Sequence, residues 1–340
     1  MNWYLQRGNK SDVVLNSKIT YSRNLRNFKF ATNNLKDVQQ IEQEIKSKLP
    51  GLGYNLKFLK MKDMDHLTKR SLLEKGLINE GVAEDKNDKI SILINDDENI
   101  CVVVNSEDHF EIQVFNPGME IEATFNLAKE IDEKFDKTFD IAKSKKYGYL
   151  TTSPINVGTG MKAVATVHLP GLTKTGNIRK ISQTINDFGL SFTGLYISNS
   201  SAIGDIYQIA NKQTLGISEE NIINNLKVIV DKVVEQEREA RKILGKNQIE
   251  LEDIIYRQYG ILTNARKLKW KEAIELMSDV KMGTDMGLMQ ELNDEVIAKI
   301  YFYINPANLQ KYFGQNLDGY DRDIKRAEMI KQIINKNERS

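Results

Sequence analysis

The helix-patterned segment YDRDIKRAEMIKQII near the C-terminus holds the residues whose spacing most clearly suggests chemistry. Arg322 and Arg326 lie four positions apart, so they share one face of a helix. Two neighbouring guanidinium groups can grip one phosphate through charge-assisted hydrogen bonds. Taken alone, however, Arg322, Lys325 and Arg326 are more typical of the solvated face of an amphipathic helix. The spacing alone therefore predicts an anion site only as one of two interpretations.

A second set of candidate residues lies between residues 105 and 170. Glu107 stands in the acidic run NSEDH, and the glycine turn NVGTG could cradle a phosphate through backbone N–H groups or simply connect two elements. His109 and His168 fall in strand-like segments, where a histidine is more often a hydrogen-bonded structural residue. No spacing of His, Cys and acidic residues is typical of a zinc site, so we expect no protein-bound metal.

Strands and helices must be mixed to position these residues. Residues 89–115 read as two β-branched runs around an Asp/Asn turn, followed by the alternating run FEIQVF, which indicates an antiparallel sheet. Residues 162–169 alternate in the same way, and the helix-patterned run EATFNLAKEIDEKFDKTF lies between them. The expected fold class is therefore α+β.

The chain changes character after a long amphipathic helix that we expect to begin at Ser218. Its hydroxyl can cap free N–H groups, and Glu219 and Glu220 suit the positive end of the helix dipole. Beyond this helix every patterned segment is helical. We therefore expect two domains, residues 1–245 with the sheet and residues 246–340 as a small all-helical domain.

Composition limits the classes of function. The 340 residues contain 48 basic and 47 acidic side chains, a net charge of +1, which offers no bulk attraction to nucleic acid or to a membrane surface. One cysteine, Cys101, excludes an internal disulfide framework, and it is expected to be an inert packed thiol. The start MNWYLQRGNK lacks the apolar run of a signal peptide, so a cytoplasmic location is expected.

The segment YGYLTTSPINVGTGMKAVATVHLPGL, residues 147–172, resembles the signature of the ATP:guanido phosphotransferases. SDVVLNSKITYSRNL, NSEDHFEIQ, GLYISNSSAIGDIYQIANKQTLG and RDIKRA are similar, in the same order, to the bacterial protein-arginine kinase branch, and the likeness extends over residues 11–335. It implies a catalytic domain with an antiparallel sheet flanked by helices, a helical C-terminal domain and a homodimer. Members of the branch transfer the γ-phosphate of ATP to arginine side chains of proteins.

The same resemblance shows that the family's phosphate-binding arginines are replaced. Their positions are occupied by Lys18, Thr20, Glu111, Lys162 and Thr193. Five positive charges thus become two lysines, two neutral residues and one acid, a formal change from +5 to +1. Lysine keeps a charge but not the two-pronged grip of arginine. A weak or inactive kinase is expected, with Mg-ATP as its cofactor only if it is active and with no cofactor otherwise.

On the acceptor side the family's residues are partly retained. Glu107 matches the acid that contacts the acceptor guanidinium, whereas its partner acid is replaced by Ser198. Arg70 matches a basic residue of the family site, and His109 lies in a segment that approaches the nucleotide. Ser153 stands where relatives carry a reactive cysteine.

The RDIKRA segment matches a family motif that recognises phosphoarginine, which assigns Arg322, Asp323 and Arg326 to that ligand. Our leading hypothesis is a phosphoarginine-binding or regulatory protein of protein quality control. One alternative is an active kinase in which Arg23, Arg26 or Arg70 has taken over the phosphate contacts. Another is a structural subunit that pairs with a kinase, an activator or adaptor, or a Clp-type ATPase. The expected partners are arginine-bearing or phosphoarginine-bearing proteins, without nucleic acid or membrane.

Overall fold

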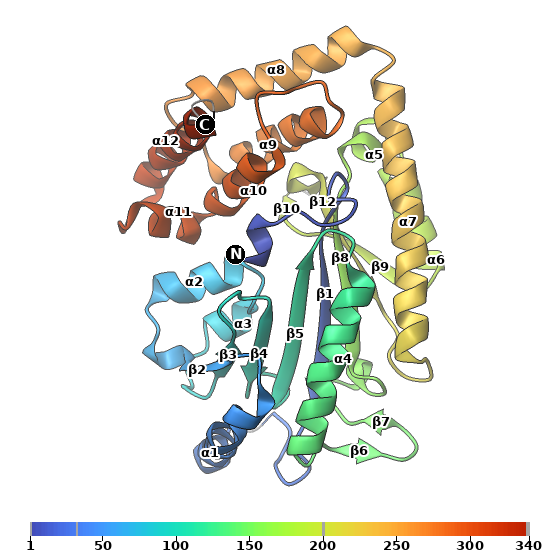
Figure 1. Ribbon diagram of the computed structural model, residues 1–340, viewed down its shortest axis with the longest axis vertical. Helices are drawn as coiled ribbons and strands as arrows, with labels where there is room; N and C mark the ends of the chain where they lie inside the picture. The colour runs from blue at the N-terminus through green and yellow to red at the C-terminus, as the bar shows by residue number, and fades with distance from the viewer. Residues whose placement is uncertain (1, 32, 199–200, 338–340) are drawn as a thin grey trace.

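An eight-stranded antiparallel sheet forms the centre of the first 245 residues in the computed structural model, which describes residues 2–31, 33–198 and 201–337 (Figure 1). In spatial order its strands are β2 (Lys57–Lys60), β3 (Ser91–Ile94), β4 (Ile100–Val104), β5 (Phe110–Pro117), β1 (Val14–Arg23), β8 (Met161–His168), β12 (Ile206–Asn211) and β9 (Leu190–Gly194). Two short hairpins project from it, β6 (Lys143–Ser144) with β7 (Gly148–Tyr149) and β10 (Ile197–Ser198) with β11 (Ser201–Ala202). The antiparallel sheet predicted from residues 89–115 and 162–169 is confirmed.

Helices cover one face of the sheet completely. They are α1 (Leu35–Leu52), α4 (Ile121–Thr138), α5 (Pro170–Lys174), α6 (Ile178–Asp187) and α7 (Glu219–Leu244). Side chains such as Ile19, Tyr21 and Ile112 point to this side and join Phe135 and Val230 in one large core. The predicted start of α7 is also confirmed, because the Ser218 hydroxyl accepts a hydrogen bond from the Asn221 backbone N–H.

The opposite face is partly covered. At one end Ile206 of β12 packs with the C-terminal helices, and over strands β2 to β5 a further layer lies on the sheet. A small core there packs Trp3 of the 3-10 helix η1 (Trp3–Leu5) against α2 (His66–Glu74), α3 (Glu80–Ala83) and the strands. Trp3 stacks on Phe115 of β5, with ring centroids 5.0 Å apart. Cys101 is fully buried in this core, and burial raises the pKa of its thiol to about 12, as expected of an inert thiol. The rest of this face carries polar residues such as Thr20 and Lys162 together with buried apolar ones such as Val164 and Ala210.

The chain after residue 246 forms a helical domain around a second core, which Ile203 and Ile206 of the sheet domain join. Its helices are α8 (Gln248–Asn264), α9 (Trp270–Asp285), α10 (Asp294–Tyr303), α11 (Pro306–Phe313) and α12 (Gly319–Asn337). In Figure 1 they lie across one end of the sheet, and the boundary we expect near residue 246 falls in the turn between α7 and α8. The α+β class, with flanking helices and a C-terminal helical region, is confirmed.

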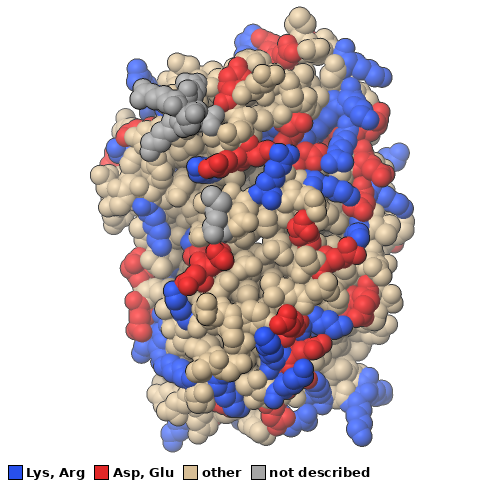
Figure 2. Space-filling model, viewed as in Figure 1, with Lys and Arg blue, Asp and Glu red and all other residues tan. Residues whose placement is uncertain are grey.

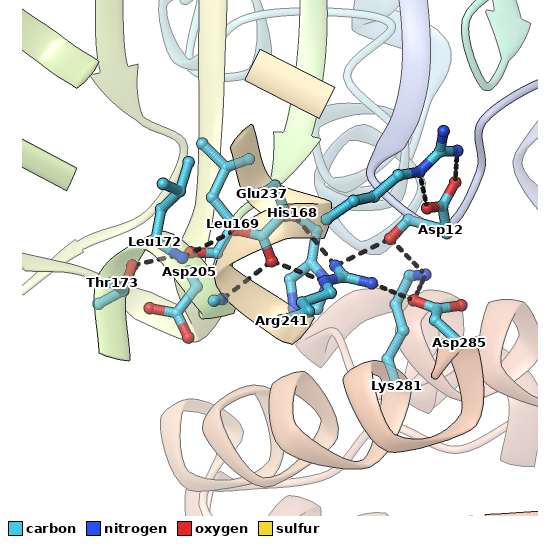
Figure 3. Close-up of polar contacts among 12 residues, drawn as sticks. Asp12, His168, Leu169, Leu172, Thr173, Asp205, Glu237, Arg241, Lys281 and Asp285 are labelled. Carbon is cyan, nitrogen blue, oxygen red and sulfur yellow. Dashed lines mark hydrogen bonds and ion pairs between the residues drawn. The ribbon is translucent and has the colours of Figure 1, made fainter. Parts of the chain in front are cut away.

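A buried network of charges joins this domain to the sheet (Figure 3). Arg241 of α7 donates to Glu237 over 2.6 Å and lies 3.4 Å from Asp285 of α9, which also pairs with Lys281 over 2.7 Å. The side chains of Arg241, Lys281 and Asp285 are only 5%, 6% and 1% exposed. Arg241 also donates to the backbone carbonyl of Asp12 over 3.0 Å. Such pairs stabilise a structure only when every charge keeps its partner.

His168 at the end of β8 takes part in the same junction. Its Nε2 lies 2.9 Å from the Ser278 hydroxyl, which donates to Asp205 over 3.0 Å. Burial keeps the pKa of His168 well below its ordinary value, so the ring is neutral. We therefore regard His168 as a structural residue that connects β8 to α9.

The exterior fits the near-zero net charge. On the face that Figure 2 shows, basic and acidic side chains alternate, without a continuous patch of one sign. No helix within residues 2–31, 33–198 and 201–337 is both long and apolar enough to cross a membrane.

Replacing Asp285 by asparagine is expected to lower the free energy of unfolding by about 3 to 5 kcal/mol, because Lys281 loses its buried counter-charge and Arg241 keeps only Glu237. Urea denaturation checks the value. Glu239→Gln is the control, because Glu239 pairs with Lys242 on the surface and its loss is expected to change stability by less than about 1 kcal/mol. If the two variants had the same free energy of unfolding, the buried network would not stabilise the protein as expected.

Candidate functional site

The sheet face opposite the main core brings the five predicted nucleotide positions together. On β1, Thr20 lies opposite Lys162 of β8. Lys18 lies two residues before Thr20, on the same side of the strand. Glu111 of β5 lies opposite Ser22, two residues from Thr20, and Thr193 of β9 lies opposite Gln208 of β12. Directly opposed residues project to the same side of a sheet, so all five positions share this face. We call it the phosphate face, after the family role that the resemblance assigns to it.

A carboxylate is held firmly on the phosphate face. Glu111 is partly buried, and its carboxylate accepts a hydrogen bond from the Ser106 hydroxyl. Burial raises the pKa of Glu111, whereas the Ser106 hydrogen bond and the charge of Lys18 act in the opposite direction. Glu111 is thus fixed by its neighbours rather than free to swing away from an incoming anion.

The lysine on β1 is also engaged by the protein. The Lys18 ammonium donates to the Gly76 carbonyl over 3.3 Å and lies 4.8 Å from the centroid of the Phe115 ring. The pKa of Lys18 is lowered to about 8, because burial, and to a smaller extent the charge of Lys162, outweigh the opposite effect of Glu111. Lys18 is therefore a cation that begins to lose its proton not far above neutral pH.

The five predicted positions of the phosphate face carry little positive charge. Its charged groups at the predicted positions are Lys18, exposed Lys162 and Glu111, a net charge of +1, beside the neutral Thr20 and Thr193. Phosphoryl transfer depends on several fixed cations that bind phosphate oxygens. An arginine guanidinium can form two parallel hydrogen bonds to one phosphate. None of the five predicted positions offers a guanidinium group.

The three arginines considered as substitutes all have carboxylate partners. Arg23 is fully buried toward α4, where its Nε and Nη2 donate to Asp132 over 2.8 and 2.7 Å. Arg26 pairs with Asp140 over 3.1 Å at the surface, and Arg70 of α2 pairs with Glu80 of α3.

These contacts give no support to the relocation of phosphate binding to Arg23, Arg26 or Arg70. In Arg23, the remaining nitrogen, Nη1, donates to the Ser22 and Thr159 carbonyls, so every arm of its fork is used.

The acceptor residue Glu107 lies exposed in the loop between β4 and β5. Asp108 fixes this loop, because its Oδ1 accepts from Asn24 over 2.6 Å and from the Thr152 backbone N–H over 2.7 Å. His109 is buried beside it, and its Nδ1 accepts from the Leu25 backbone N–H over 3.0 Å. Burial lowers the pKa of His109, so it acts here as a neutral structural group.

The partner position of Glu107 cannot be compared in the same way. Ser198 ends strand β10, but its side chain lies outside the part of the chain that the structure describes. Ser153 accepts a hydrogen bond from the Thr151 hydroxyl through its backbone carbonyl, over 2.8 Å. The catalytic roles of Glu107 and Ser198 stay predictions.

Sequence reasoning missed the residues that hold the acceptor loop. Asn105, in the left-handed region with φ 59°, is buried and both polar atoms of its amide lack a partner among the described residues. Ser106 and Asp108 had no assigned role either, although both stand in the run NSEDH. The only signal in the sequence was this cluster of short polar side chains.

The two arginines of the C-terminal segment have different surroundings. Arg326 is buried, and it donates to the carbonyls of Ile304 and Leu268 over 2.8 Å each and to Asp323 Oδ1 over 2.8 Å. Arg322 is only partly buried, and its guanidinium has no hydrogen bond or ion pair to any described residue. Arg326 thus fixes α12 to its neighbours, and Arg322 is available to a ligand.

No group of three or more His, Cys, Asp or Glu side chains among the described residues could hold a metal ion. That part of the chain therefore offers no candidate metal site, and the absence of a protein-bound metal stays a prediction.

Known proteins resemble this chain over nearly its whole length. Residues 37–240 match the family described as ATP:guanido phosphotransferase, C-terminal catalytic domain, and residues 248–340 match the protein-arginine kinase McsB C-terminal domain. The protein-arginine kinase of Halothermothrix orenii is 38% identical over 98% of this chain and 96% of its own. That of Bacillus subtilis is 36% identical over 98% of this chain and 93% of its own.

Solved structures agree in fold. The duplicated taurocyamine kinase from Schistosoma mansoni, with bound components of a transition state analogue, covers 66% of this chain and 33% of its own at TM-score 0.58 and 24% identity. Lombricine kinase covers 68% of both chains at TM-score 0.58 and 21% identity. At these identities the likeness concerns the fold alone. Together with the family matches, it shows that the chain belongs to the protein-arginine kinase family of ATP:guanido phosphotransferases.

Proposed function

We propose that this chain is a protein-arginine kinase homologue that is weak or inactive in phosphoryl transfer and that binds phosphoarginine in proteins as a regulatory component of protein quality control. The observation that supports it most is the carboxylate of Glu111 held on the phosphate face. An anion entering there meets a like charge fixed by Ser106, and the nearby cation, Lys18, is already engaged by Gly76 and Phe115.

The size of this effect is sufficient for a large loss of activity. Charge-assisted hydrogen bonds contribute about 1.5 to 3 kcal/mol each, so the loss of three or four removes roughly 5 to 10 kcal/mol of phosphate stabilisation. Each 1.4 kcal/mol or so corresponds to about tenfold in rate. Lys162 and Lys18 cannot restore it, because an ammonium group lacks the planar fork.

Phosphoarginine binding is supported by the state of Arg322. An unpartnered, partly buried guanidinium can form strong hydrogen bonds to a phosphoryl group without first breaking an ion pair. Asp323 lies beside it in the chain, and its second carboxylate oxygen, Oδ2, is not used by Arg326. This oxygen suits the modified guanidinium of the ligand.

The setting that we propose follows from the family. The protein works in the cytoplasm as a homodimer and meets proteins that carry arginine or phosphoarginine, together with a kinase activator or adaptor and a Clp-type ATPase. Nucleic acid and membranes are not among its partners.

Residual kinase activity is the second candidate function, because Glu107 is retained and exposed in a well-fixed loop. In that case Mg-ATP would be the cofactor. The two functions are separated by the measurements below.

Arg322→Ala is expected to weaken binding of a phosphoarginine peptide by about tenfold or more, because the lost charge-assisted hydrogen bonds contribute about 1.5 to 3 kcal/mol. Calorimetry measures it, with the unphosphorylated arginine peptide as a ligand control. Arg257→Ala is the matched protein control, since Arg257 pairs only with Asp253 on the surface of α8. Equal affinities of the wild type and Arg322→Ala would refute phosphoarginine binding at this site.

Mg-ATP is expected to give no measurable heat of binding with the wild-type chain, whereas the double variant Thr20→Arg with Glu111→Arg gains at least about tenfold in affinity, because two guanidinium groups replace a hydroxyl and a carboxylate. Glu107→Gln, on the acceptor side, serves as the control and leaves nucleotide affinity unchanged. A clear dissociation constant for the wild type, with label transfer that Glu107→Gln abolishes, would establish the kinase instead.

Lys18 is expected to titrate near pH 8 in the folded protein, against 10.5 for a free side chain. Between these values the unfolded chain binds more protons than the folded chain, so the stability contributed through Lys18 rises with pH. The unfolding free energy of the wild type should therefore rise with pH relative to Lys18→Met. In an NMR titration Glu111→Gln should lower the pKa of Lys18 further, since Glu111 raises it. An unchanged pKa would show that the two groups do not interact.

A further inference from the structure

Helix α2 of the sheet domain is docked on the N-terminal end of α11 in the helical domain. The Glu74 carboxylate at the end of α2 accepts from the backbone N–H groups of Ala307 and Asn308 over 2.7 and 2.9 Å. The Ser71 hydroxyl, one turn earlier, donates to the side chain of Asn308 over 2.7 Å. Three hydrogen bonds therefore connect the two domains at this point.

The same carboxylate lies within electrostatic reach of the proposed phosphoarginine site. The charge of Arg322 acts on Glu74, together with that of Arg70, and Arg326 in turn is affected by Glu74. Burial raises the pKa of Glu74, while the two backbone N–H groups and these arginines oppose the rise. The hydrogen bonds agree with this, because Arg326, one turn after Arg322 on α12, donates to the Ile304 carbonyl just before α11. Glu74, bound to the first N–H groups of α11, thus lies at the same end of α11 as Arg326.

An unused donor lies at the same junction. Asn308 is 1% exposed, and its Nδ2 has no acceptor among the residues that the structure describes. A buried amide without a partner is costly, and a phosphoryl oxygen would satisfy it. Arg322 and Asn308 thus have donors without a hydrogen-bond partner among the described residues, and the Glu74 carboxylate binds the first N–H groups of α11.

The segment after Glu74 continues directly to the phosphate face. The Gly76 carbonyl accepts from Lys18 over 3.3 Å, and the Leu77 carbonyl accepts from Gln113 of β5 over 3.1 Å. A movement of the end of α2 would change both contacts. The four residues from Glu74 to Leu77 thus connect the helical domain to the sheet.

From these contacts we infer that Glu74 is an internal competitor of phosphoarginine, and that a phosphorylated ligand held by Arg322 displaces its carboxylate from α11 and loosens α2 from the helical domain. The inference rests on the proposed function. A dianionic phosphoryl group and the buried carboxylate repel each other, so they cannot both occupy the junction at low cost. By linkage, whatever loosens Glu74 strengthens ligand binding, and ligand binding loosens Glu74 by the same factor.

Free phosphoarginine is the probe in the decisive experiment, which uses the full-length chain. Saturating ligand is expected to speed hydrogen exchange at the Ala307 and Asn308 amides, because they lose their bonds to Glu74. Glu74→Gln, which keeps the size of the side chain, is expected to bind the ligand about threefold to tenfold more tightly, since one like charge is removed. Glu328→Gln on α12 is the matched control with no such gain, because its carboxylate pairs with Lys325.

The outcomes separate this inference from the function on which it rests. If Arg322→Ala loses the ligand but Glu74→Gln gains no affinity, or exchange at Ala307 and Asn308 is unchanged or slower with ligand, Glu74 is only a helix cap and the inference fails. If Arg322→Ala binds as well as the wild type, the proposed function fails first. Should Glu74→Gln fold poorly, the exchange measurement on the wild-type chain decides alone.

Discussion

The pairing of β1 with both β5 and β8 decides which side chains of this protein can act together. Because side chains alternate along a strand, this register turns Lys18 and Thr20 to the phosphate face and Ile19 and Tyr21 to the core. A slip of one residue would bury the polar set and expose the apolar one, so the core enforces the register. A substitution of Lys18 or Thr20 therefore changes the surroundings of the residues opposite them on β5 and β8.

Local patterns in the sequence predicted the strands, the start of α7 and the helical nature of the last residues, since periodicity and capping depend on neighbours along the chain. The contacts of Lys18 could not be predicted in this way. Gly76 lies 58 residues away, and its carbonyl reaches Lys18 only because of how α2 packs on the sheet. The pairing of Ser106 with Glu111, five residues apart, likewise depends on how the loop between β4 and β5 turns.

The C-terminal arginines show the same limit. Helical spacing predicted that Arg322 and Arg326 share a side of α12, but it could not show that the carbonyls of Leu268 and Ile304 already occupy Arg326. Arg23 and Arg241 are comparable cases, because both use the guanidinium fork to hold buried carboxylates rather than ligands. In this protein an arginine's partners, and not its position in a motif, decide whether it is free to bind phosphate.

The replacement of phosphate-binding arginines that the family resemblance implies is compatible with an intact fold. Stability comes from the large core beneath the sheet and from the second core, which the helical domain forms with Ile203 and Ile206. Five arginines gathered at one unliganded site, as the family pattern requires, repel one another, so their replacement relieves strain that only the nucleotide would otherwise offset. Arg326 is different, because its removal would leave buried carbonyls without a donor. A substitution at an exposed position of the sheet face such as Lys162 therefore costs little stability, whereas Arg326 is held by the packing of α12.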